Sequence, residues 1–133
     1  MADYSPNSQR RILIVDDDHE LRTMLGLALT GEGYAVSHAD NGNEAVSLHN
    51  RNPFDLIITE LILEDKDGFK TLMELRRHPA PAKLIATAKE HWLSTSLCLR
   101  MAKHLGAHSV LSKPFEPEQL LVAVKDVLNA PGQ

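Results

Sequence analysis

Short apolar runs alternate along the chain with longer segments in which apolar residues recur at helical spacing, and this alternation limits the possible folds most strongly. The short runs cover residues 11–15, 34–39, 54–59, 83–87 and 109–112. Near-continuous apolar character over four to six residues is typical of strands that are buried on both faces. Five such strands in strict alternation with five helices predict a parallel sheet covered on both faces and joined by right-handed crossovers. We therefore expect an α/β fold in one compact domain.

The helical segments are recognised by their apolar stripes and by their end signals. Asn41, followed by Glu44 three residues later, resembles a capping box that opens the second helix, which we expect to end before Pro53. Glycines after the first and fourth segments are typical helix stops. The predicted stripes are Leu21, Met24, Leu25, Ala28 and Leu29; Phe69, Leu72 and Met73; Leu93, Leu97 and Met101; and Leu120, Leu121, Val124, Val127 and Leu128.

Length and composition narrow the class of protein. At 133 residues the chain suits a single domain, and we divide it into a leader (1–9), a domain (10–129) and a tail (130–133). The formal net charge of -4 argues against nucleic acid or a membrane surface as the direct partner. No apolar stretch approaches the roughly 20 residues of a membrane span, and the N-terminus lacks the apolar core of a signal peptide.

The single cysteine, Cys98, excludes an internal disulfide and fits a reducing cytoplasm, where we expect the protein to be located. Cys98 lies in an apolar helical pattern, so a buried, unreactive thiol is expected. The seven histidines are scattered along the chain, and we expect no histidine metal site. No output domain follows in the sequence, so a stand-alone or excised domain is expected.

Polar residues with complementary chemistry stand where four of the predicted strands end. Asp16, Asp17 and Asp18 follow the first strand, and the other strand ends carry Glu60, Thr87 and Lys113. In open parallel sheets, ligands bind beyond the carboxyl ends of the strands. Carboxylates without a soft ligand suit Mg²⁺, while a hydroxyl and a lysine suit phosphoryl oxygens. Each residue alone has an ordinary structural explanation, but their joint occurrence indicates a phosphoryl site.

In combination these segments resemble the receiver domain of two-component response regulators over about residues 10 to 129. The resemblance rests on the segment Ile12 to Asp18, the spacing from Glu60 to Asp67-Gly68, Thr87-Ala88, Gly106-Ala107 and Lys113-Pro114-Phe115. It implies the flavodoxin-like (βα)5 fold, a three-layer sandwich whose five-stranded parallel sheet has the order 2-1-3-4-5.

The resemblance also implies roles for individual residues. In a full receiver the acid at the position of Glu60 accepts a phosphoryl group from a histidine kinase or phosphotransfer protein. Mg²⁺ would be held by Asp16 and Asp17 together with Glu60, and Thr87 and Lys113 would bind the phosphoryl oxygens. The bond between Lys113 and Pro114 is expected to be cis. Such a domain is not an enzyme beyond the chemistry at its own pocket.

Glu60 is the main departure from the receiver pattern, because the family has aspartate at this position. The glutamate carboxylate lies about 1.5 Å further from the backbone. An error of about 1 Å in the placement of reacting groups costs on the order of a hundredfold in rate. The longer arm can instead reach Lys113 and partly imitate the phosphorylated state, although a carboxylate carries less charge than a phosphoryl group. Mg²⁺ binding would then be weakened or lost.

Two further departures concern signalling. Val110 stands where many receivers have an aromatic switch residue, and valine cannot swing as such a ring does. The stretch from Thr87 to Lys113 is about four residues longer than in the family, with the excess in residues 89–96 around Trp92. It is either a tolerated surface insertion or a reshaped partner surface anchored by Trp92. Four residues would add about one helical turn.

Three functions remain open on this basis. The first is an atypical receiver that acts mainly by protein–protein contact with an output protein or domain, with Glu60 as a partial mimic of phospho-aspartate. The second is a conventional Mg²⁺-dependent phosphoacceptor for a histidine kinase. The third is an Mg²⁺-dependent phosphatase or phosphotransferase, against which stands the lack of a substrate-sized insertion.

Overall fold

The computed structural model describes residues 10–63, 67–89 and 94–130 of the chain. Its five strands are β1 (Arg11–Val15), β2 (Ala35–Ala39), β3 (Leu56–Glu60), β4 (Lys83–Ala88) and β5 (Ser109–Ser112). Its five helices are α1 (His19–Gly31), α2 (Gly42–Arg51), α3 (Gly68–Arg76), α4 (Thr95–His104) and α5 (Pro117–Asn129). None of the described helices is long and apolar enough to span a membrane.

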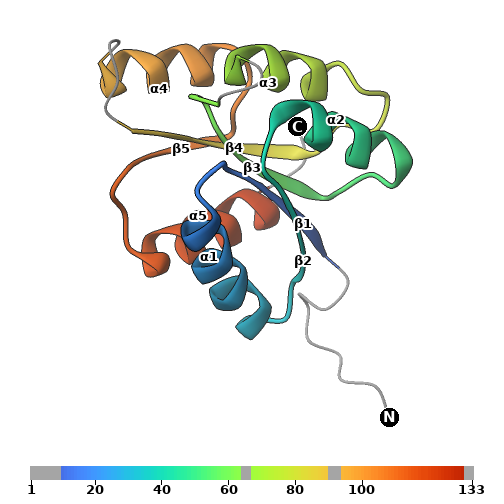
Figure 1. The fold of residues 1–133 in the computed structure, drawn as a ribbon, viewed down its shortest axis with the longest axis vertical. Helices are drawn as coiled ribbons and strands as arrows, with labels where there is room; N and C mark the ends of the chain where they lie inside the picture. Colours follow the sequence, from blue (N-terminus) through green and yellow to red (C-terminus); the bar gives the residue numbers. More distant parts are fainter. Residues whose placement is uncertain (1–9, 64–66, 90–93, 131–133) are drawn as a thin grey trace.

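The strands form one parallel sheet in the order β2-β1-β3-β4-β5, which confirms the predicted flavodoxin-like topology. Figure 1 shows α1 and α5 on one face of the sheet and α2, α3 and α4 on the other. Because β1 lies between β2 and β3 in the sheet, α1, which connects β1 to β2, and α2, which connects β2 to β3, cover opposite faces, and the carboxyl ends of β1 and β3 lie side by side (Figure 1).

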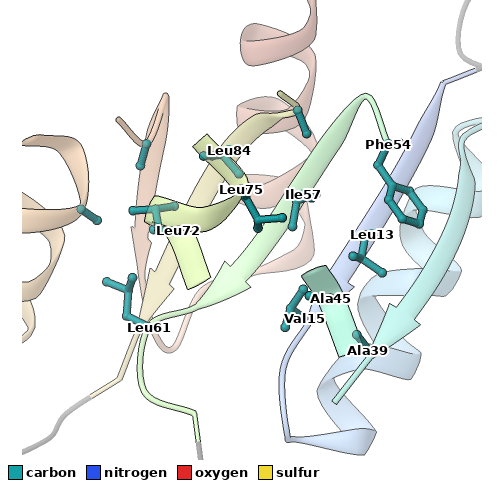
Figure 2. Close-up of a cluster of buried hydrophobic side chains, with 14 of the residues drawn as sticks. Leu13, Val15, Ala39, Ala45, Phe54, Ile57, Leu61, Leu72, Leu75 and Leu84 are labelled. Atoms are coloured by element: carbon teal, nitrogen blue, oxygen red, sulfur yellow. The ribbon is translucent and has the colours of Figure 1, made fainter. Parts of the chain in front are cut away.

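The core consists of two apolar clusters, one on each face of the sheet. Figure 2 shows the cluster beneath α2, α3 and α4, where Leu13 and Ile57 of the sheet meet Leu72 and Leu75 of α3. The other cluster packs Ile12, Ile14 and Ile58 against apolar residues of α1 and α5. Every residue of β3 is buried, as expected of a central strand covered on both faces. The sheet is therefore a rigid base for the residues at its carboxyl edge.

The structure corrects several details of the sequence analysis. β3 begins at Leu56 and includes Glu60, whereas the predicted strand covered residues 54–59. Met24 and Met101, predicted on core-facing stripes, are 46% and 40% exposed. Cys98 and Ala102 are the buried residues of α4, which is therefore rotated from the predicted stripe. The predictions for Leu93, Trp92, the leader at 1–9 and, apart from Ala130, the tail at 130–133 lie outside the described residues.

The cap of α2 is present in a modified form. Asn41 Oδ1 accepts a hydrogen bond from the Glu44 amide at 2.7 Å, but Glu44 Oε1 accepts from the amide of Asp40, not from that of Asn41. The helix begins at Gly42 and ends at Arg51, before Pro53 as predicted. Asp18 caps α1 in the same way by accepting from the Leu21 amide.

Candidate functional site

The predicted site residues meet at the carboxyl edge of the sheet. Asp16 follows β1, and Glu60 ends β3, where its register partner in β4 is Thr87. Lys113 follows β5, and its amide donates to the Ala88 carbonyl at 2.8 Å. The Lys113–Pro114 peptide bond is cis, as the resemblance implied. Asp16, Glu60 and Thr87 are buried, so the pocket is built into the fold and is not a loose surface cluster.

The Lys113 ammonium lies between two carboxylates. Its Nζ donates to Asp16 Oδ2 at 2.6 Å and lies 2.6 Å from Glu60 Oε1. The lysine side chain is 13% exposed and the glutamate 0%. The second contact is an ion pair without hydrogen-bond geometry, which leaves Oε1 with no hydrogen-bond partner among the described residues. Glu60 thus reaches Lys113, the contact that its extra length was expected to allow.

The pKa values of Glu60 and Lys113 are set by burial and by the contacts of these residues. Burial raises the pKa of the Glu60 carboxyl, while Lys113 and the Ile62 amide act in the opposite direction. Burial would lower the pKa of Lys113, but its contacts with Asp16 and Glu60 outweigh burial and raise it. Lys113 is therefore a firmly charged ammonium shared by two acids.

The backbone after β3 fixes the direction of the Glu60 side chain. Glu60 Oε2 accepts from the Ile62 amide at 3.0 Å, and the Leu61 amide donates to the Thr87 carbonyl. The loop then returns to α3, where the Gly68 amide donates to the Leu61 carbonyl at 3.1 Å. A Cβ added at Gly68 would lie 2.2 Å from that carbonyl oxygen. Gly68 is therefore required for the loop to close on β3.

Replacing Gly68 with alanine is expected to lower the free energy of unfolding by about 2 kcal/mol or more, because the added methyl group overlaps backbone that cannot move aside. Gly31→Ala is the matched control, since nothing lies within 4 Å of its added Cβ. That change should leave stability unaltered or raise it by up to about 1 kcal/mol. Urea unfolding of both variants measures the difference, and equal stabilities would contradict the close approach.

The other two acids after β1 are arranged differently. Asp17 is half-buried, whereas Asp18 is exposed and serves as the N-cap of α1. Arg22, which the sequence analysis missed, donates from Nη1 to the Asp16 carbonyl oxygen at 2.5 Å. It ties the acidic loop to the first turns of α1. Its position six residues after Asp16 gives no sequence signal that separates it from a solvated helix residue.

The described residues do not fit a bound Mg²⁺ in this arrangement. No group of three or more carboxylate, histidine or cysteine ligands gathers among them. Asp16 Oδ1 accepts from the Asp18 amide and Oδ2 from Lys113. Glu60 contacts the Ile62 amide with one oxygen and Lys113 with the other. The ammonium thus contacts the carboxylates that would have to ligate a metal cation.

A groove of about 540 Å³ extends from Lys113 between α4 and β5. It is lined by Thr95, Ser96, Leu99, Arg100, Lys103, Val110, Ser112 and Lys113, three of them cations and none of them acidic. Val110 is half-buried on this wall. Residues 90–93, which include Trp92, lie outside the described residues, and α4 begins at Thr95.

Comparison with known proteins identifies relatives over most of the chain. The profile of the family described as "Response regulator receiver domain" matches residues 12–125. The "Probable transcriptional regulator ycf27" of Cyanidium caldarium is 34% identical over 120 residues, which are 90% of this chain and 47% of that protein. The chain spans about half or less of the length of the curated relatives that it matches.

Solved structures agree with this result. A putative response regulator from Chloroflexus aurantiacus J-10-fl matches with a TM-score of 0.82 and 32% identity, covering 91% of this chain and 98% of that one. The chemotaxis response regulator CheY4 of Vibrio cholerae matches with a TM-score of 0.79 and 28% identity, covering 89% and 98%.

Proposed function

The chain belongs to the response regulator receiver domain family of two-component signalling, and we propose that it is an atypical receiver that is a poor phosphoacceptor. Receiver domains are generally signalling modules, not enzymes, and they generally bind Mg²⁺ at the site of phosphorylation. In this proposal the protein is cytoplasmic and acts mainly through contact with an output protein or domain. Any nucleic-acid binding would belong to a separate output domain.

The observation that carries the proposal is the position of Lys113 Nζ, 2.6 Å from both Asp16 Oδ2 and Glu60 Oε1. We assign Glu60 to the position at which receivers carry the phosphoaccepting aspartate. Its oxygens contact the ammonium and the Ile62 amide, so neither is free for in-line attack on a phosphodonor. Lys113, one of the two groups expected to bind phosphoryl oxygens, already has a carboxylate beside it, and the other, Thr87, is the register partner of Glu60 in β4.

The same contact makes Glu60 a partial imitation of a phosphorylated aspartate. A negative oxygen beyond β3 engages Lys113, as a phosphoryl oxygen would. The imitation is incomplete, because one carboxylate brings a single charge and a phosphoryl group brings nearly two. We infer that the pocket is held in one state without a kinase.

We propose that a partner binds in the groove next to this pocket, in keeping with a signalling role. The groove between α4 and β5 ends at Lys113 and carries Arg100 and Lys103. A partner segment with acidic residues would complement these charges. Val110 has no aromatic ring that could change position with the state of the pocket. In this proposal the groove is therefore always accessible to the partner. In this proposal Trp92, three residues before Thr95 in the sequence, is an aromatic anchor for the partner.

Conventional Mg²⁺-dependent phosphorylation is the second candidate, favoured by the retention of Asp16, Asp17, Thr87 and Lys113 in the sequence. The two candidates differ in their response to Mg²⁺. Conventional phosphorylation requires the protein to bind Mg²⁺, and so does a Mg²⁺-dependent phosphatase or phosphotransferase activity.

Adding about 10 mM MgCl₂ is expected to leave the melting temperature of the wild type unchanged, because Lys113 contacts the carboxylates that would ligate the ion. A ligand at 100 times its Kd would add about 2.7 kcal/mol and raise the melting temperature by several degrees. Thermal unfolding against NaCl of equal ionic strength measures the effect. A rise in the wild type that Asp17→Asn abolishes would contradict the proposal and favour a Mg²⁺-dependent activity.

A further inference from the structure

His49 forms a buried junction at the end of the sheet opposite the candidate site. It lies in the last turn of α2 and is fully buried. Its Nδ1 accepts from the Phe54 amide at 3.1 Å, and its Nε2 lies 2.8 Å from the Ala80 carbonyl oxygen. The imidazole therefore joins α2, the approach to β3 and the connection from α3 to β4.

The two backbone partners fix the protonation state of the ring. An amide N–H only donates, so Nδ1 must carry a free lone pair. A carbonyl oxygen only accepts, so Nε2 must carry the hydrogen. The neutral Nε2–H form is the only form of His49 that satisfies both contacts. A proton added from solvent to Nδ1 would face the Phe54 N–H, and that hydrogen bond would be lost.

Among the described residues, no acidic group forms an ion pair that would stabilise a positively charged His49 ring. From the connection after α3, the His78 ring contacts His49 edge-on with centroids 4.4 Å apart. From β1, the Arg11 guanidinium lies over the Phe54 ring and donates to the carbonyl oxygens of Asn52 and Pro53. Asp55 at the approach to β3 accepts from the Arg11 amide, and no described carboxylate forms an ion pair with His49.

We propose that His49 is an acid-sensitive latch, whose protonation at Nδ1 releases the Phe54 amide and loosens the junction of α2, β3 and the α3–β4 connection. The device lies in the layer that covers one face of the sheet, at the amino end of the strand that carries Glu60. It is independent of phosphoryl chemistry and of the carboxylate pocket.

The direction of the pH effect follows from the pKa. Burial lowers the pKa of His49, the hydrogen bond to Ala80 acts in the opposite direction, and His78 and Arg11 lower it further. The unfolded chain has the ordinary value of about 6.5. Below that pH the unfolded state binds more protons, so stability is lost as the pH falls from about 6.5 to the folded pKa. The unfolding constant changes by up to about tenfold per pH unit for one proton.

NMR of the full chain tests the latch without a variant. The ring resonances of His49 should titrate with a midpoint below 6.5, and Phe54 amide protection, corrected for the intrinsic exchange rate, should fall with the same midpoint. His49→Gln, which retains an acceptor and a donor but cannot titrate, should remove the pH dependence of Phe54 protection. His108→Gln, at another histidine with a lowered pKa, should leave it intact. Constant Phe54 protection while His49 titrates, or an unchanged acid response in His49→Gln, would overturn the proposal.

Discussion

Lys113→Met is expected to lower the free energy of unfolding by about 3 kcal/mol or more at neutral pH. The change removes an ammonium that contacts both Asp16 and Glu60, and those acids are 4% and 0% exposed. Two buried carboxylates would then face each other without a cation, and removing one partner of a buried ion pair costs far more than the pair contributes. Urea unfolding of wild type and variant measures the loss.

Lys125→Met is the matched control, because Lys125 pairs with Glu32 at 3.7 Å where both side chains are largely exposed, at 55% and 39%. Its effect should stay within about 1 kcal/mol. The double variant Lys113→Met, Glu60→Gln should recover part of the loss, since one uncompensated charge is removed with the lysine. Small, similar losses for both lysine variants would show that the ammonium does not hold the two acids together.

Much of the fold follows from the sequence because the central strands are buried on both faces. Residues 11–15 and 109–112 form strands with the predicted bounds, and α2 lies between the predicted cap and Pro53. The apolar run from Phe54 misled the prediction at β3. Phe54 is buried beside the sheet and not within it, because its amide is held by His49. The pattern of apolar residues predicts which side chains are buried, but it does not predict the hydrogen-bond partner of each backbone amide.

Helix faces were less predictable than helix positions. Met101 fits an apolar stripe by spacing, yet Cys98 and Ala102 are the residues of α4 that face the sheet. Small residues on this face bring α4 close to the sheet, and the larger apolar side chain lies outside. The contact between His49 and His78 was likewise missed, since it joins α2 to the connection after α3, and these meet only in the folded chain.

The candidate site was predictable as a set of residues but not as a set of contacts. Strand ends meet at one edge of a parallel sheet, so Asp16, Glu60, Thr87 and Lys113 were expected to gather. That Lys113 contacts both Asp16 and Glu60 could not be predicted, because it depends on the lengths and directions of three side chains. The support that Arg22 gives to the Asp16 backbone crosses from helix to loop, and no motif marks it.

Restoring aspartate at position 60 is expected to raise the rate of phosphorylation by acetyl phosphate at least about a hundredfold over the wild type. The shorter side chain withdraws from Lys113 by about 1.5 Å, which frees the ammonium for a phosphoryl oxygen and Asp16 for Mg²⁺. Glu118→Asp makes the same chemical change at an exposed position on α5 and should have no effect. Comparing Glu60→Asp with Glu118→Asp separates the effect of shortening the side chain in the pocket from any general effect of replacing glutamate with aspartate.

Intact-protein mass spectrometry after incubation with Mg²⁺ and acetyl phosphate is the most direct measurement. If Glu60 holds the pocket closed through Lys113, Glu60→Asp gains the mass of one phosphoryl group, while the wild type and Glu118→Asp remain unmodified. Phosphorylation of the wild type at a rate comparable to that of Glu60→Asp would contradict the account and make the chain a working phosphoacceptor.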